Sequence, residues 1–187
     1  MKILTTFIIS MCVLSAKAQT ITHSRFLLSD KADSFRSIEL EINNKYVIGL
    51  SGTGDIQYLE NLEGDELFEG DCERLGFPIK FYDTYDIHDI SGRLKSIGNI
   101  KIAFNNTFDM HDISGSLKSI GSINIKYYNT FDMHDPEGKI KSVGNVSIKY
   151  YNVFDHDRQF GQIKSITGNN DILRVRSRLN RFEVIRY

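Results

Sequence analysis

Apolar and polar side chains alternate along the chain from residue 100 to residue 111, with one interruption at Asn106. Five apolar side chains share one parity in this stretch: Ile100, Ile102, Phe104, Phe108 and Met110. A period of two residues predicts a single long strand with one buried face. The stretch from Ile123 to Met133 repeats the pattern, so the same strand is expected again.

The segment that follows each expected strand has the residues of a tight turn. Asp112 to Gly115 fits a type I turn that ends in glycine, and it predicts a hairpin loop. In that register Met110 faces Leu117 on the apolar side, and Asp109 faces Lys118 on the polar side. The other copies give the same ion pairs: Asp86 with Lys95, Asp132 with Lys141 and Asp155 with Lys164.

The alternation belongs to a tandem repeat. Its histidines stand at positions 88, 111, 134 and 156, and a nearly fixed period of this length is typical of stacked repeats. We therefore predict an all-β fold, a stack or meander of antiparallel β-hairpins. The spacing Leu94-x-x-Ile97-x-x-Ile100 also fits half of a leucine-rich repeat, so a parallel β-solenoid or leucine-rich-repeat-like fold is the alternative. A two-residue Gly98-Asn99 turn needs a β-bulge nearby, or a third loop residue, to keep Leu94 on the apolar face.

The sequence divides into four segments. Met1-Lys2, an apolar stretch from Ile3 to Ser15 and a small-x-small cleavage site before Gln19 predict a signal peptide over 1–18. N-terminal β-hairpins with an acidic flank follow over 19–76, then four β repeats over 77–169, and basic closing strands over 170–187. The protein is thus expected to be exported, to the periplasm, the cell surface or the exterior, and not to span a membrane.

Charge is unevenly distributed along the chain. The formal net charge is −1 and would become −3 without residues 1–18, which argues against a nucleic-acid partner. Residues 55–73 carry eight acidic side chains and no base, whereas the end of the chain is rich in arginine. Head-to-tail self-association is one interpretation, and two solvated flanks are the other. Cys72 would be the single thiol left after cleavage, expected to be buried or idle.

A repeated Asp-x-His-Asp motif is the candidate for metal chemistry. A carboxylate and an imidazole two residues apart on a strand point to the same side, so they suit a divalent metal ion. The candidate ligands are Asp86, His88, Asp109, His111, Asp132, His134, Asp155 and His156. The competing interpretation is structural: the Asp residues serve as cross-strand partners of Lys, and the histidines recur only because the unit was copied.

No catalytic constellation is recognisable in the sequence. It lacks a Gly-x-Ser-x-Gly motif and a phosphate-binding glycine loop. We therefore expect a structural or binding module without catalytic activity or cofactor, which presents a repeated β surface to a protein or glycan. A metal-binding protein is the first alternative and a hydrolase the second. The tyrosine pairs 127–128 and 150–151 could form an aromatic strip, or one of each pair could pack in the core.

Part of the repeat resembles known sequences at the level of motif. The sequence Gly-Lys-Ile-Lys-Ser-Val-Gly-Asn at 138–145 is followed by Ile-Lys-Tyr-Tyr-Asn at 148–152 and by Phe154-Asp155. This arrangement resembles tandem β repeats of uncharacterised exported proteins of Bacteroidetes-type bacteria. The resemblance covers about residues 77–169, and it implies export and a β-repeat fold but no known chemistry.

Overall fold

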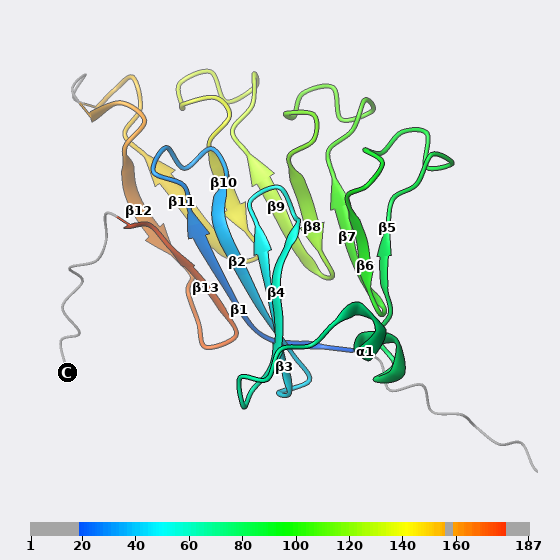
Figure 1. Ribbon diagram of the computed structural model, residues 1–187. Helices are drawn as coiled ribbons and strands as arrows, with labels where there is room; N and C mark the ends of the chain where they lie inside the picture. Colours follow the sequence, from blue (N-terminus) through cyan, green and yellow to red (C-terminus); the bar gives the residue numbers. More distant parts are fainter. Residues whose placement is uncertain (1–18, 156–158, 179–187) are drawn as a thin grey trace, which may run out of the picture.

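The computed structural model describes residues 19–155 and 159–178, and these fold almost entirely into two β-sheets (Figure 1). The five-stranded sheet has the order β13-β1-β2-β3-β4. Its strands are β1 (Ile21–Leu28), β2 (Phe35–Ile42), β3 (Tyr46–Ser51), β4 (Ile56–Asn61) and β13 (Leu173–Arg176). A short helix, α1 (Glu69–Arg74), links this sheet to the repeats.

The repeats form an eight-stranded sheet in which sequence neighbours are spatial neighbours. Its strands are β5 (Ile79–Phe81), β6 (Leu94–Ile97), β7 (Ile100–Phe104), β8 (Leu117–Ile120), β9 (Ile123–Tyr127), β10 (Ile140–Val143), β11 (Val146–Tyr150) and β12 (Ile163–Thr167). Every adjacent pair runs antiparallel. The expected all-β hairpin meander is therefore confirmed, and the parallel solenoid or leucine-rich-repeat alternative is wrong.

Two-residue turns and β-bulges together set the register of the repeat sheet. Ile97 pairs with Ile100 across Gly98-Asn99, and Gly98 has φ +57°, a conformation that glycine adopts without strain. Further along the strand the ladder steps from Ser96 to Leu94 and leaves Lys95 as the extra residue. Of the two devices that the sequence allowed for this turn, the structure uses the bulge.

The long strands predicted from the alternation are only partly present. β7 ends at Phe104, and the residues up to Ser116 form a wide loop instead of a continued strand. We call the four equivalent segments 82–93, 105–116, 128–139 and 151–162 the repeat loops. Their described residues, which leave out 156–158, follow one another along one edge of the sheet (Figure 1). The prediction of a strand over 100–111 is therefore wrong beyond Phe104.

The two sheets pack face to face around one hydrophobic core. Side chains such as Leu40 from the five-stranded sheet and Ile102 and Ile148 from the repeat sheet are fully buried in it. The loop between β1 and β2 also bonds to the repeats, because the Ala32 carbonyl accepts the Ile140 N–H at 2.9 Å. The outer face of the repeat sheet is polar, and its eight strands contain no acidic residue, as suits a face that contacts water.

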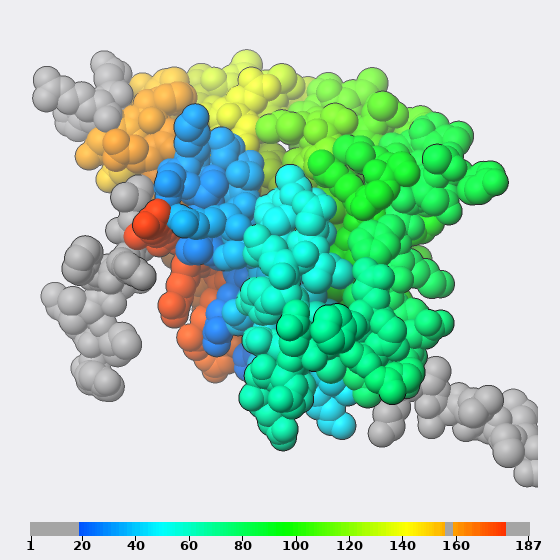
Figure 2. Space-filling model, viewed as in Figure 1, coloured from blue at the N-terminus to red at the C-terminus, as the bar shows by residue number. Residues whose placement is uncertain are grey.

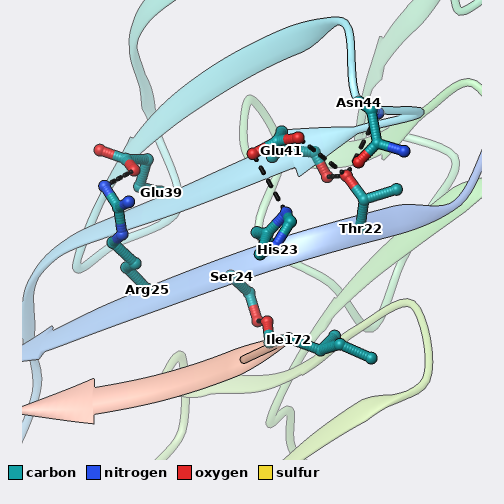
Figure 3. A network of polar contacts seen from close by, with 8 residues as sticks. All are labelled: Thr22, His23, Ser24, Arg25, Glu39, Glu41, Asn44 and Ile172. Carbon is teal, nitrogen blue, oxygen red and sulfur yellow. Dashed lines mark hydrogen bonds and ion pairs between the residues drawn. The ribbon is translucent and has the colours of Figure 1, made fainter. Parts of the chain in front are cut away.

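The N-terminal and C-terminal strands do not extend the repeat sheet. They build the second sheet, which covers it. β13 lies parallel to β1, and the Ser24 hydroxyl donates to the Ile172 carbonyl at 3.1 Å (Figure 3). On the other side of β1, Arg25 pairs with Glu39 on β2. The part of the predicted closing strands from residue 179 onwards lies outside the described residues, as does the predicted signal peptide.

Helix α1 was not expected from the acidic composition of its segment. It buries Cys72 completely, and burial raises the pKa of this thiol to about 11. The expectation of a buried thiol is thus confirmed. Within the described residues, no helix has the length and apolar character needed to cross a bilayer.

Candidate functional site on the repeat loops

Each repeat loop begins with a tight turn that two polar side chains hold in place. In the second copy the Asn106 side chain accepts the Phe108 N–H at 3.0 Å. The Asp109 carboxylate accepts the Asn106 N–H at 3.1 Å, while the Asp109 N–H bonds back to the Asn106 carbonyl at 3.0 Å. These local bonds replace ladder bonds, so they end the strand. They also leave Phe108, between the two polar residues, directed away from the sheet.

The same turn recurs in every copy. Its two polar residues are Asp83 and Asp86, Asn106 and Asp109, Asn129 and Asp132, and Asn152 and Asp155. In the sequence, Asn106 interrupts the alternation of apolar and polar residues. The spacing Asn-x-x-Asp is itself a turn signal, and it would have located these loops.

The repeated Asp of each loop also forms an ion pair with the repeated Lys of the following strand. Asp109 Oδ1 lies 2.6 Å from Lys118 Nζ, with the carboxylate mostly shielded from water. The other pairs are Asp86 with Lys95 and Asp132 with Lys141, both at 2.6 Å, and Asp155 with Lys164 at 2.7 Å. All four predicted ion pairs are confirmed. They join a loop to a strand, however, and not two strands of a ladder.

A bulge residue supplies the lysine in each pair. The ladder skips Lys95, Lys118, Lys141 and Lys164 in turn, and a bulge redirects the side chain of its extra residue. The hydrogen bond from Lys118 lowers the pKa of Asp109. Burial raises the pKa of Asp132, but the bonds from Lys141 and from the Asn129 backbone outweigh it, so this pKa is also lowered.

The repeat histidines of the first three copies contact the next copy, not a shared ligand site. The His88 ring lies 4.4 Å from the Phe108 ring, measured between centroids, and His111 lies at the same distance from Phe131. His134 packs on Phe154 at 4.6 Å. These contacts run from loop to loop along the edge of the sheet, so each histidine supports the phenylalanine of its neighbour.

Among the described residues, the predicted metal ligands are not gathered into one cluster. The repeated Asp carboxylates are occupied by lysine and by backbone N–H groups, and the repeat histidines His88, His111 and His134 face aromatic rings. In the part of the chain that the structure describes, no three His, Cys, Asp or Glu side chains are placed to hold a metal ion. His156 lies outside that part, and metal binding by the Asp/His ladder stays a prediction.

Large apolar side chains project from the loops into solvent. Met110 is 83% exposed and Phe108 69%, although the alternation predicted both on a buried face. The set of equivalent residues, which we call the apolar ridge, is Tyr85, Ile87, Phe108, Met110, Phe131, Met133 and Phe154. The loops that carry it form the upper rim of the molecule in the space-filling view, from green to orange (Figure 2).

The predicted aromatic strip is not formed by the tyrosine pairs. Tyr127, Tyr128 and Tyr150 are buried, and their hydroxyl groups donate to backbone carbonyls. Both tyrosines of the first pair therefore pack inside, where the sequence suggested one of the two. The exposed aromatic row lies instead on the loops, in the apolar ridge.

Comparisons of this chain with models of protein families, with curated proteins and with solved structures find no match. The resemblance of the repeat motif to exported β-repeat proteins thus stays a prediction.

Proposed function

We propose that this protein is an exported binding module without catalytic activity that holds a protein partner on the apolar ridge of its repeat loops. The observation that supports this proposal is the apolar ridge. Two large apolar side chains per loop are exposed at equivalent positions in the first three copies, and one is exposed in the fourth. Monomeric proteins seldom expose such a continuous row, and rows of this kind commonly mark interaction surfaces.

The ridge rests on a rigid support. Asn106 and Asp109 fix the turn that carries Phe108, and Lys118 ties that turn to the strand below. A surface held in its bound shape loses less entropy on association than a flexible loop does. Each copy uses two polar residues and a lysine to hold its loop. Presentation of the apolar side chains explains this better than loop closure alone.

The composition of the ridge favours protein over glycan. Methionine side chains such as Met110 and Met133 adapt to varied apolar surfaces, and they offer no hydrogen bond donor to a sugar. Asp89 and Asp112 lie half-buried beside the ridge residues of their loops. The expected partner therefore presents apolar side chains flanked by basic groups.

Export is part of the proposal, and it rests on the N-terminal sequence. Cleavage after Ala18 would yield a mature chain that starts at Gln19. Amino-terminal sequencing of the protein recovered outside the cytoplasm tests this directly. A chain recovered there with Met1 intact, or found only in the cytoplasm, would overturn it.

The ridge is tested with two matched variants of the mature chain. The ridge variant carries Phe108→Ser, Met110→Ser, Met133→Ser and Phe154→Ser. The control variant carries Lys80→Ser, Lys101→Ser and Lys149→Ser on the outer face of the repeat sheet, where these lysines are also exposed. Each immobilised protein is exposed to a cell-envelope extract of the source organism, and captured proteins are purified and titrated back.

We expect a captured protein to bind the wild type and the control with equal affinity, and to bind the ridge variant about tenfold or more weakly. Equal affinity for all three would overturn the ridge as the binding surface. Ridge-dependent binding to an array of glycans, with no protein captured, would replace the protein partner by a sugar.

A further inference from the structure

The second repeat departs from the others at the first residue of its loop. Tyr82, Tyr128 and Tyr151 occupy this position in the first, third and fourth copies, but the second copy has Asn105. Each of the three tyrosine rings lies close to the ammonium group of its bulge lysine, at 5.3, 5.1 and 5.4 Å respectively. The second copy is therefore the one that lacks a tyrosine at this position.

Tyr128 shows what the tyrosine does. Lys141 Nζ lies 5.1 Å from its ring centroid, a cation–π contact. Its hydroxyl donates to the Ile148 carbonyl of the next hairpin at 3.2 Å, and its ring packs edge-on against Tyr150 at 5.7 Å. Tyr82 makes the same three contacts, with Lys95, with the Ile102 carbonyl and with Phe104.

In the second copy all three partners are present but the ring is not. The equivalents of these partners are Lys118, the Ile125 carbonyl and Tyr127. Asn105 turns its side chain aside and donates to the Ser116 hydroxyl at 2.8 Å. No side chain in residues 19–155 and 159–178 is found to donate to the Ile125 carbonyl.

A groove of about 500 Å³ opens at this place in the surface. It is lined by Asn105, Asp112, Lys118, Asn124, Ile125, Lys126, Tyr127, Asn129, Phe131, Asp132 and Lys141. The three unmatched partners of the missing ring are all in its wall. The groove therefore includes the space that a tyrosine ring fills in the neighbouring copies.

We propose that this groove binds a phenolic ring, supplied as a tyrosine side chain by the protein partner, and this inference rests on the proposed function. The Lys118 ammonium would lie over the ring, Tyr127 would meet its edge, and the Ile125 carbonyl would accept its hydroxyl proton. Phe131 belongs both to the apolar ridge and to the wall of the groove. A partner lying along the ridge can thus place one tyrosine into the groove.

The chemistry of the groove selects among aromatic side chains. A phenylalanine ring would bring no donor to the Ile125 carbonyl, and a phosphorylated tyrosine would bring no hydroxyl proton to it. The groove also differs from the ridge in number. The ridge repeats from loop to loop, whereas the groove left by the missing ring occurs in the second copy. A tyrosine bound in this groove would therefore fix the register in which an extended partner lies along the ridge.

The probe is N-acetyl-L-tyrosinamide, titrated into the mature chain and followed by amide chemical shifts, with N-acetyl-L-phenylalaninamide as the comparison. We expect shifts at Lys118, Ile125 and Tyr127, and several-fold weaker binding of the phenylalanine amide. Asn105→Tyr fills the groove from within, so it should abolish these shifts and raise the melting temperature. Unchanged shifts in Asn105→Tyr, or no shifts in the wild type, would overturn the proposal.

A reciprocal variant keeps the test independent of that one substitution. Tyr82→Asn empties the same position in the first copy and should create a second binding site, seen as new shifts near Lys95 and Ile102. If Tyr82→Asn shows no new shifts near Lys95 and Ile102, the ring contacts are not what determines binding, and the proposal is overturned. The ridge variant leaves the groove lining intact, so it should bind the tyrosine amide normally. If the ridge variant loses partner binding but binds the tyrosine amide normally, both proposals are upheld. If the wild type binds the amide but no partner depends on the ridge, only the proposed function is overturned.

Discussion

Lys118 meets Asp109 at 2.6 Å although the two residues do not face each other in the sheet. The ladder steps from Ser119 to Leu117 and passes over Lys118, which stands at a β-bulge. Asp109 itself lies in the loop, where it also accepts a backbone N–H of the turn. One carboxylate thus joins the loop to the strand, and this relationship recurs in each copy.

The protein should be less stable in acid, because protonation of the Asp carboxylates breaks the ion pairs. The folded-state pKa of Asp109 and of Asp132 is lowered, so their contribution is present at neutral pH and is lost as the pH falls below about 4. Melting temperatures measured from pH 7 to pH 3 should therefore decline. Asp109→Asn should cost about 0.5 kcal/mol at pH 7, because the pair is partly exposed, and should flatten the decline. An equally steep acid decline in Asp109→Asn would contradict this origin.

The sequence allowed the pairing of Asp109 with Lys118 to be predicted, although the strand register used for it was wrong. Both the expected hairpin and the observed bulge bring the two residues together, and the spacing is common to all copies. The alternation then misled at Phe108. Period-two patterning does not distinguish a strand from a turn whose apolar residues point to solvent, and the turn is set by Asn106, a residue outside the pattern.

The position of the second sheet could not be read from the sequence. Repeats predict how a strand pairs with its neighbours, but they do not say which segment covers the apolar face. Strand β13 pairs with β1 across almost the whole length of the chain, and nothing local specifies such a contact. The groove at Asn105 could not be predicted from the sequence either, because it is recognised only from the contacts that the tyrosines of the other copies make.

Core and ridge substitutions should differ sharply in their effect on stability. Ile102 is fully buried between the sheets, so Ile102→Ala should lower the free energy of unfolding by about 3 kcal/mol. Met110 is exposed, and Met110→Ala should change it by no more than about 0.5 kcal/mol. Urea unfolding of the two variants measures both values. A loss at Met110 close to that at Ile102 would mean that the ridge residue is part of the core.

Cys72 should be unreactive in the folded protein. Its thiol is buried in helix α1, and burial raises its pKa to about 11, so little thiolate is present at pH 8. Labelling with a disulfide-forming reagent should be slow in buffer and fast in denaturing urea. A variant with Ser91→Cys, at an exposed loop position, provides the reactive control. Equal labelling rates at both positions in buffer would show that Cys72 is accessible.

The histidines are expected to act through aromatic contacts. His111 packs on Phe131 of the following loop, and a contact of this type contributes about 0.5–1 kcal/mol. The variant His88→Ala, His111→Ala and His134→Ala should therefore melt at a lower temperature than the wild type. A chelator should leave both melting temperatures unchanged, because the repeated Asp carboxylates already hold lysine.

Metal analysis of the purified mature chain completes this test. If the protein carries a stoichiometric metal ion, and if chelation lowers the melting temperature of the wild type but not of the triple variant, the Asp/His ladder is a metal site. The contacts with phenylalanine would then describe only the metal-free state. Adding His156→Ala to the triple variant extends the same comparison to the fourth copy. A drop in melting temperature that is identical with and without chelator would leave the aromatic contacts as the role of these histidines.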